Sequence, residues 1–195
     1  MREQVVKDIK EEFLGASFRY LVSHGLENTS IRDLCKNIGI SSGSLYYWFE
    51  NKDDVYINAA RYGLTKVAES LLGYACDNIA NTESFFDDAL LEEFVKYRDE
   101  LRLIYQVATS PVYGERMRKK AMELNESYST YACKLGDILG CTSEIMAPVI
   151  YLFISILLDY IVWGDYDTTK LQIRYLYEDL MIRIKNPNIV EELNA

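Results

Sequence analysis

Helical periodicity along almost the whole chain is the feature that most limits the possible fold. Apolar residues recur at spacings of three and four, and no run of alternating β-branched residues stands out. Proline, which interrupts helix interiors, occurs only as Pro111, Pro148 and Pro187 in 195 residues. We therefore predict an all-α protein.

Three helices are predicted before residue 50. The first runs from about Val5 to His24 and stops at a glycine. The second follows Ser30, which with Asp33 three residues later forms a capping-box pattern that satisfies free backbone N–H groups at the helix start. Gly39 ends this helix, and Ser41 can cap a third, short one. The apolar stripe predicted for the first helix is Val6, Ile9, Phe13, Ala16 and Tyr20.

The remaining sequence predicts further helices, and the last two differ in kind from the others. Residues 144–163 are apolar on two faces, one centred on Leu152 and one on Leu157. Such a helix needs two packing partners. A two-fold dimer in which each subunit contributes its last two helices would supply the second partner, and a single thick monomeric core is the alternative. The other expected helices cover about 52–72, 84–97, 101–109, 114–139 and 169–184.

Charge and reactive residues narrow the function classes. The net charge is −9, but residues 1–53 carry seven Lys and Arg against eight Asp and Glu, so most of the acidity lies later in the chain. Four scattered cysteines and a single histidine, His24, do not form a zinc-ligand pattern, and no cofactor or metal is expected. The cysteines suit buried apolar positions better than a redox switch, and His24 suits a helix C-terminus better than catalysis.

The sequence favours a cytoplasmic protein without a membrane span. The chain opens on an amphipathic pattern and not on a signal sequence. Its longest uncharged apolar run, Met146 to Leu158, has 13 residues, which is too short to cross a bilayer.

The stretch ISSGSLYYWFENK, residues 40–52, combines small polar residues with aromatic ones on one short helix. Neither a core helix nor an ordinary surface helix needs this mixture. Two helices joined by a tight turn match the helix-turn-helix plan, whose second helix enters the major groove of DNA. Small side chains at that helix start would let the backbone approach DNA, and hydroxyl groups would bond phosphates or bases.

The segment FLGASFRYLVSHGLENTSIRDLCKNIGISSGSLYYWFENKDDV resembles the N-terminal domain of the tetracycline-repressor (TetR) family. The shared features are TS-R-D-L, then G-x-S-x-G-x-L-Y-x-x-F, then N-K, in register over about residues 8–58. The resemblance implies a dimeric DNA-binding regulator, usually a repressor, which a small ligand in the C-terminal helices releases from a palindromic operator. It also implies a helix-turn-helix domain at 1–52 and a ligand-binding and dimerisation domain at 53–195.

Carried over by position, the resemblance implies three kinds of DNA contact. The family often has Lys at the position of Ser42 and His at that of Trp48, so this chain is expected to rely more on hydrogen bonds and less on charge. Trp48 is therefore left out of the predicted site. The implied contacts are Thr29 and Ser30 with phosphate, Ser42, Gly43 and Ser44 with bases, and Tyr46, Tyr47 and Lys52 with the backbone.

Aromatic residues of the second part are candidates for an effector pocket or for the core. In the whole chain, tyrosine is the commonest aromatic residue, with sixteen against seven Phe and two Trp. An apolar pocket with a few phenol groups suits a lipophilic or aromatic molecule, whereas Glu93, Glu123 or Asp159 beside the rings would suit a cationic one. The candidate ligand residues are Tyr62, Phe94, Tyr105, Tyr113, Tyr128, Tyr131 and Trp163.

Two other functions compete with the regulator. An enzyme is not expected, because the chain has no phosphate loop, dinucleotide glycine pattern or paired-histidine metal motif. A helical sensor or protein-interaction module with weak or vestigial DNA binding is the other alternative, favoured by Ser42 and by the nearly neutral first domain. Selection of a palindrome from random DNA separates the module from the regulator.

Overall fold

A computed structural model describes residues 2–122 and 125–186, and within these residues all regular structure is helical. The all-α prediction is confirmed. By their contacts the residues form two compact units, which are described separately. The described part of unit 1 is 2–67 with 99–122, and that of unit 2 is 68–98 with 125–186. The division at residue 52 that the sequence suggested stays a prediction.

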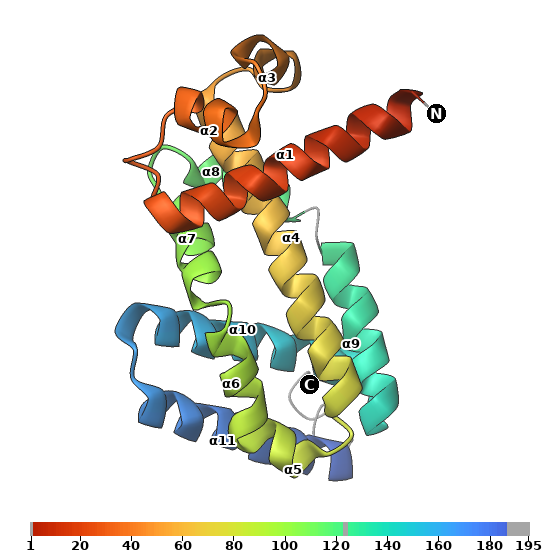
Figure 1. Cartoon of the computed structure of the whole chain (residues 1–195). Coiled ribbons are helices and arrows are strands. Elements are labelled where there is room, and N and C mark those ends of the chain that lie inside the picture. The colour runs from red at the N-terminus through yellow and green to blue at the C-terminus, as the bar shows by residue number, and fades with distance from the viewer. Residues whose placement is uncertain (1, 123–124, 187–195) are drawn as a thin grey trace. The chain divides into compact units, whose positions relative to one another are not determined.

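Unit 1 contains the three N-terminal helices and the elements packed on them (Figure 1). They are α1 (Arg2–His24), α2 (Ile31–Ile38), α3 (Ser42–Trp48), the first part of α4 (Lys52–Asn78), nearly all of α7 (Arg98–Thr109), and α8 (Gly114–Met122). The first three helices begin and end close to the predicted residues, whereas α4 runs to Asn78, beyond its predicted end at about 72.

The buried face of α1 is shorter than the predicted stripe. Phe13, Phe18 and Leu21 are buried, but Val6 and Ile9 are 42% and 43% exposed. Figure 1 shows the reason, since the first turns of α1 extend beyond the helices on which its second half packs. Periodicity identifies which face of a helix is apolar, not how much of that face finds a partner. The prediction for Val6 and Ile9 was wrong.

Helices α1 and α4 approach closely at two glycines. A Cβ atom at Gly63 would lie 2.2 Å from the Phe18 ring, and one at Gly15 would lie 3.2 Å from the Tyr62 ring. Because glycine has no side chain, each ring can lie directly against the opposite helix backbone. The core of unit 1 gathers around this crossing and includes the fully buried Leu34, Leu45, Val55, Tyr56 and Ile57.

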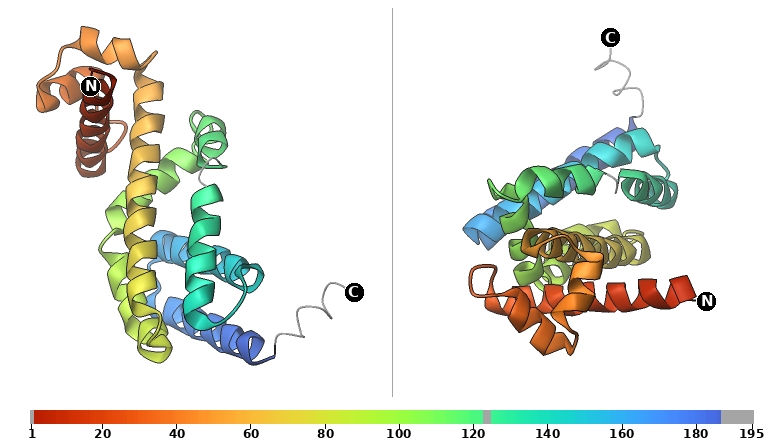
Figure 2. Two further views of the ribbon diagram at one scale, coloured as in Figure 1. Left: turned by 90° about the vertical axis from the view of Figure 1, so that its right-hand side faces the viewer. Right: turned by 90° about the horizontal axis from the view of Figure 1, so that it is seen from above.

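Unit 2 consists of the end of α4 and six further elements (Figures 1 and 2). Helix α10 contacts both α9 and α11, and η1, a single π-helical stretch, contacts α11. Phe86 of η1 stacks on Tyr177 of α11, and Lys170 of α11 pairs with Asp88 at 2.6 Å. The six elements are α5 (Thr82–Ser84), η1 (Phe85–Ala89), α6 (Leu90–Val95), α9 (Asn125–Leu139), α10 (Ser143–Trp163) and α11 (Tyr166–Lys185).

The seam over 114–139 predicted a single long helix, and the structure describes it in two stretches, α8 as far as Met122 and α9 from Asn125. The two residues between them lie outside the described residues. Since α8 belongs to unit 1 and α9 to unit 2, the apolar positions of the seam serve two separate cores.

The two predicted apolar faces of α10 do not separate into one buried and one exposed face. Ile150, Leu157 and Ile161 of one face are buried. In the face centred on Leu152, Val149 and Tyr160 are also buried, while Leu152 and Trp163 are exposed. With 21 residues α10 is long and apolar enough to cross a membrane by length and composition alone, although its uncharged apolar run, Met146 to Leu158, has only 13 residues. One such helix is weak evidence for a span, because core helices pass the same test, and α10 packs on α9 and α11.

Candidate DNA-binding site

The start of α2 is built by the predicted capping box. The backbone N–H of Asp33 donates to Ser30 Oγ at 3.2 Å, and the Asp33 carboxylate accepts from the Ser30 backbone at 2.9 Å and from its hydroxyl at 2.5 Å. These bonds from Ser30 hold the pKa of the Asp33 carboxyl below its usual value. Ser30 is exposed, so the box leaves it at the protein surface. The capping-box prediction is confirmed.

A tight turn then leads from α2 into α3. Gly39 ends α2 with φ of 77°, a left-handed conformation that glycine adopts without steric cost. Ser41 caps α3, because its Oγ accepts from the Ser44 backbone N–H at 3.1 Å. The hydroxyl groups of Ser41 and Ser44 are also within hydrogen-bond distance, at 2.9 Å. The predicted cap is confirmed, and it aligns the first turn of α3.

Helix α3 is held to the protein by a narrow apolar edge. Leu45 is completely buried, and Phe49, directly after the helix, packs on Phe13 of α1 with ring centroids 5.6 Å apart. Lys10 of α1 lies 5.0 Å from the Phe49 ring centre on a cation–π contact. These contacts join residues more than 35 positions apart in the sequence and hold α3 on α1.

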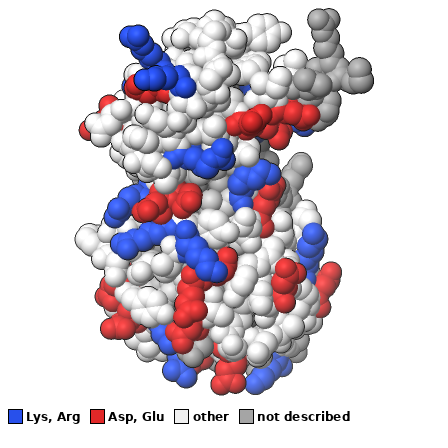
Figure 3. All heavy atoms as spheres, in the orientation of Figure 1, with Lys and Arg blue, Asp and Glu red and all other residues white. Residues whose placement is uncertain are grey.

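The rest of α3 faces outward. Tyr47 is 81% exposed and Tyr46 is 56% exposed. The helix contains no charged residue, and in Figure 3 the top of the molecule, where α3 lies in Figure 1, is largely white. An exposed surface of hydroxyl groups, peptide groups and phenol rings can bond both bases and phosphates. The predicted DNA contacts that share this exposed surface are Ser42, Gly43, Ser44, Tyr46 and Tyr47.

Two other predicted DNA contacts, Lys52 and Thr29, differ in exposure. Lys52 is exposed at the first residue of α4, where its ammonium lies 5.0 Å from the Tyr56 ring centre. Thr29 is buried, its hydroxyl donates to the Gly25 carbonyl at 2.7 Å, and its own carbonyl accepts from the Tyr56 hydroxyl. The Thr29 side chain therefore has internal partners, and its contact with phosphate stays a prediction.

Trp48 faces the protein, not the exposed surface of α3. Its ring lies against Phe13 at 6.1 Å between centroids. The indole Nε1 is buried and has no hydrogen-bond partner among the described residues. Trp48 thus packs on α1, and the substitution that distinguishes it from the usual family residue lies behind the outward face of α3.

The candidate ligand residues are divided between the two units. Tyr62, Tyr105 and Tyr113 belong to unit 1, whereas Phe94, Tyr131 and Trp163 belong to unit 2. Phe94 is a core residue at 3% exposure, and Trp163 is 75% exposed. The Tyr128 side chain lies outside the described residues.

Three of these aromatic residues have specific neighbours. Tyr113 meets Tyr56 edge-on at 6.2 Å between centroids, and burial raises the pKa of the Tyr113 hydroxyl. Lys66 lies 5.9 Å from the ring centre of Tyr62, and Tyr131 has the corresponding contact with Lys134 at 5.3 Å. A ligand contact from any of them stays a prediction.

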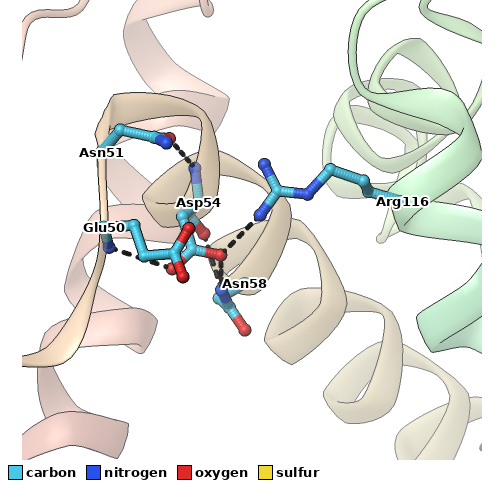
Figure 4. A network of polar contacts seen from close by, with 5 residues as sticks. All are labelled: Glu50, Asn51, Asp54, Asn58 and Arg116. Carbon is cyan, nitrogen blue, oxygen red and sulfur yellow. Dashed lines mark hydrogen bonds and ion pairs between the residues drawn. The ribbon is translucent and has the colours of Figure 1, made fainter.

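A polar network at the start of α4 was missed by sequence reasoning (Figure 4). Asp54 accepts from Arg116 of α8 at 2.9 Å, and it also accepts from Asn58 and from the Glu50 backbone. Asp54 and Arg116 are 62 residues apart, so no local pattern relates them. In the part of the chain that the structure describes, no three His, Cys, Asp or Glu side chains gather as metal ligands would.

Comparison with known proteins agrees with this geometry. Residues 13–59 match the family model described as "Bacterial regulatory proteins, tetR family", which covers the second half of α1 through the start of α4. The HTH-type transcriptional repressor AcnR of Corynebacterium glutamicum is 21% identical over 150 residues, 77% of this chain and 78% of AcnR. AcnR of Corynebacterium efficiens is 19% identical with the same coverage. The motif, the three-helix geometry and these matches agree, and residues 13–59 form a DNA-binding domain of the tetR regulatory-protein family.

Proposed function

We propose that the chain is a dimeric repressor that binds a palindromic DNA operator through α3 and the start of α4, and that a small lipophilic or aromatic molecule releases it. The observation that carries this proposal is the division of α3, in which Leu45 is buried and the faces with Ser42 and Tyr47 are exposed. A recognition helix needs this division, because one edge must anchor it while the other enters the major groove.

The DNA contacts follow from the exposed groups. Ser42 and Ser44 at the start of α3 would meet base edges, where their small size permits close approach, and Gly43 between them leaves the backbone uncovered. Tyr46, Tyr47 and Lys52 would meet the phosphates on either side of the groove. Ser30, exposed at the start of α2, would add one further phosphate contact.

Salt dependence should be weak for a protein of this class. Each phosphate neutralised by Lys or Arg adds about 0.9 to the slope of log affinity against log salt concentration. Helix α3 contains no Lys or Arg, and Lys52 is the charged group among the proposed contacts. Binding would therefore depend mainly on hydrogen bonds, which salt screens little.

Dimerisation through α10 and α11 is supported by exposed apolar side chains on both helices. Monomeric proteins rarely leave large continuous apolar patches in water, so a second copy that packs the same two helices against them gives a two-fold four-helix interface. We call these residues the α10–α11 surface: Tyr151, Leu152, Val162, Trp163, Leu171, Tyr175 and Ile182.

We propose a chemical class for the effector and not a particular compound. The abundance of tyrosine favours a molecule with apolar rings, and the acidic surplus of the later sequence leaves a cationic one as the alternative. Matched neutral and cationic aromatic compounds would be tested for a rise in melting temperature, since a ligand that binds the folded state stabilises it. A rise with neutral compounds alone would remove the cationic alternative.

Selection of DNA from a random duplex pool tests the central proposal, together with the mass of the protein in solution. A dimer should enrich a two-fold palindrome at low salt. Because the regulator acts on DNA, its site of action in a bacterium would be the cytoplasm. A stable dimer that enriches no sequence would overturn the operator proposal and would favour a sensor or protein-interaction module.

A further inference from the structure

We propose that Arg116 of α8 is a positioning residue for DNA binding, which acts through Asp54 to hold the first turn of α4 and the end of α3 in place. The inference rests on the proposed DNA contacts of α3 and Lys52. It assigns a role to a residue far outside the matched family segment, which ends at residue 59.

Asp54 joins the segment between α3 and α4 to the rest of unit 1 (Figure 4). One carboxylate oxygen accepts from the Glu50 backbone N–H at 3.3 Å, which restrains the chain directly after α3. The other accepts from Asn58 at 3.0 Å and from Arg116 at 2.9 Å. The Asp54 backbone N–H in turn donates to the Asn51 side chain at 2.9 Å. A single carboxylate therefore ties α8 to both sides of the α3–α4 connection.

Arg116 comes from a corner between α7 and α8 that has little freedom to move. A Cβ atom at Gly114 would lie 2.6 Å from the Ala108 carbonyl oxygen, so the two helices meet too closely for a larger residue. Ser110 Oγ accepts from the Val112 and Tyr113 backbones, and Arg118 donates to the Ala108 carbonyl at 3.0 Å. These hydrogen bonds lie within the corner itself and do not involve α4.

The same corner contacts α4 at a second point. The Tyr113 ring meets the Tyr56 ring edge-on, and the Tyr56 hydroxyl donates to the carbonyls of Leu26 and Thr29, in the turn before α2. Tyr56 is completely buried, so this contact belongs to the core. The corner thus fixes α4 through an apolar contact at Tyr113 and an ionic one at Arg116.

The ionic contact lies close to the proposed phosphate contacts. Lys52 is two residues before Asp54, and a binding site works only when its groups are held within a fraction of an ångström of their productive positions. Asp54 would also repel phosphate if its charge were unopposed, and Arg116 supplies the opposite charge. The Asp54 side chain is only 14% exposed and that of Arg116 is 44% exposed, so solvent screens this pair less than a fully exposed one.

Charge alone offers a competing explanation. Helix α8 also carries Arg118 and Lys119, and a basic helix attracts DNA whether or not it contacts α4. The chain provides a matched control on the same helix, because Lys119 pairs with Glu115 at 2.8 Å and both side chains are largely exposed, at 74% and 76%. Arg116→Ala and Lys119→Ala each remove one positive charge, but only the first removes a contact with α4.

The experiment measures the affinity of the full chain for its selected palindrome at two salt concentrations. The variants are Arg116→Ala, Arg116→Lys, Lys119→Ala, Asp54→Ala and the double variant Asp54→Ala with Arg116→Ala. We expect Arg116→Ala to weaken binding by about three- to tenfold, the range of one charged, partly screened hydrogen bond. Arg116→Lys should recover part of the loss, and Lys119→Ala should change affinity by less than about twofold.

The double variant completes the test. If Arg116 acts through Asp54, Arg116→Ala should have no larger effect than Lys119→Ala once Asp54 is alanine. Equal losses for Arg116→Ala and Lys119→Ala, or an undiminished loss in the Asp54→Ala background, would overturn the positioning role. Circular dichroism confirms that each variant is folded. A wild-type protein that selects no palindrome would instead overturn the proposed function, so the two failures are distinguishable.

Discussion

Tyr47 is the most exposed large side chain of α3, and its hydroxyl group is the part expected to matter for DNA binding. Tyr47→Phe removes only this oxygen and leaves the ring in place. We expect affinity for the selected palindrome to fall by about three- to tenfold, the value of one hydrogen bond to a charged phosphate. Equilibrium binding of labelled DNA measures the change. The melting temperature should not move, because the side chain is 81% exposed.

Tyr105→Phe is the matched control for that substitution. Tyr105 is another exposed tyrosine of unit 1, but it lies on α7 and not on the proposed DNA surface. Its loss should leave DNA affinity within about twofold of the wild type, as for other surface substitutions. An equal loss from both variants would argue against a direct phosphate contact by Tyr47.

Ser30 controls the ionisation of Asp33, and this can be measured without DNA. In Ser30→Ala the side-chain hydrogen bond, the larger cause of the lowered pKa, disappears. The Asp33 pKa should therefore rise toward its usual value in an NMR titration. Since the folded pKa is the lower one, ionised Asp33 stabilises the protein above about pH 4, and this stabilisation is lost as pH falls through the folded pKa.

The corresponding stability measurement is a melting curve as a function of pH. Ser30→Ala should lower the melting temperature near neutral pH by about 2–4 °C, as expected for loss of a helix cap in a chain of this size. The difference in melting temperature from the wild type should shrink in acid, because the Asp33 carboxyl is then protonated and its charge no longer strengthens the hydrogen bonds with Ser30. A difference that grows as pH falls would contradict the assignment.

At the scale of elements, the crossing of α1 and α4 depends on the absence of a side chain at Gly63. Gly63→Ala places a methyl group 2.2 Å from the Phe18 ring, so the two helices must separate or the ring must turn. Overpacking of this kind costs about 1–3 kcal/mol. Urea denaturation measures the loss. Helix α1 also supplies Phe13 under α3, and DNA affinity should fall with stability.

Gly73 provides the opposite expectation in the same helix. Among the residues that the structure describes, no atom lies within 4 Å of a Cβ atom built there, so Gly73→Ala meets no obstacle from them. Alanine favours the helical conformation over glycine by about 0.5–1 kcal/mol, and this substitution should raise the stability of the protein. Two Gly→Ala changes in α4 would thus move stability in opposite directions. If both substitutions destabilise the protein, α4 requires glycine at these positions for a reason other than contact with α1.

Local signals predicted the elements well, because their causes are local. The caps at Ser30 and Ser41 and the stop at Gly39 depend on neighbours within four residues, and the structure has all three. Contacts between distant segments leave no such signal. Val6 has the right periodicity for burial but is 42% exposed. The apolar pattern over 114–139 did not indicate that its residues would belong to two separate cores.

The same distinction holds for the candidate site. The outward face of α3 could be predicted, because its first residues are small and polar and only Leu45 and Trp48 turn toward the protein. Two other features could not be predicted, namely the inward position of Thr29 and the Asp54–Arg116 pair. They depend on contacts with α4 and α8 that form only in the folded chain. The family model ends at residue 59 and carries no information about Arg116.

At the scale of the whole molecule, the apolar side chains exposed on α10 and α11 should decide the oligomeric state. Leu152 is 53% exposed, so Leu152→Glu costs the isolated subunit little, but it would bury a carboxylate in the proposed interface. We expect the mass in solution, measured by light scattering, to fall from two chains to one. The palindrome should then bind about a hundredfold or more weakly, because the second half-site is no longer engaged intramolecularly.

Val112→Glu is the control for Leu152→Glu. Val112 is 65% exposed and apolar, but it belongs to the α7–α8 corner of unit 1 and not to α10 or α11. The same charge added there should leave the dimer mass unchanged. If Leu152→Glu also remains a dimer, the α10–α11 surface is not the interface. If it becomes a monomer that binds DNA as tightly as before, the operator is read by single chains. Either result separates dimerisation from DNA recognition, because α3 keeps its exposed face in both variants.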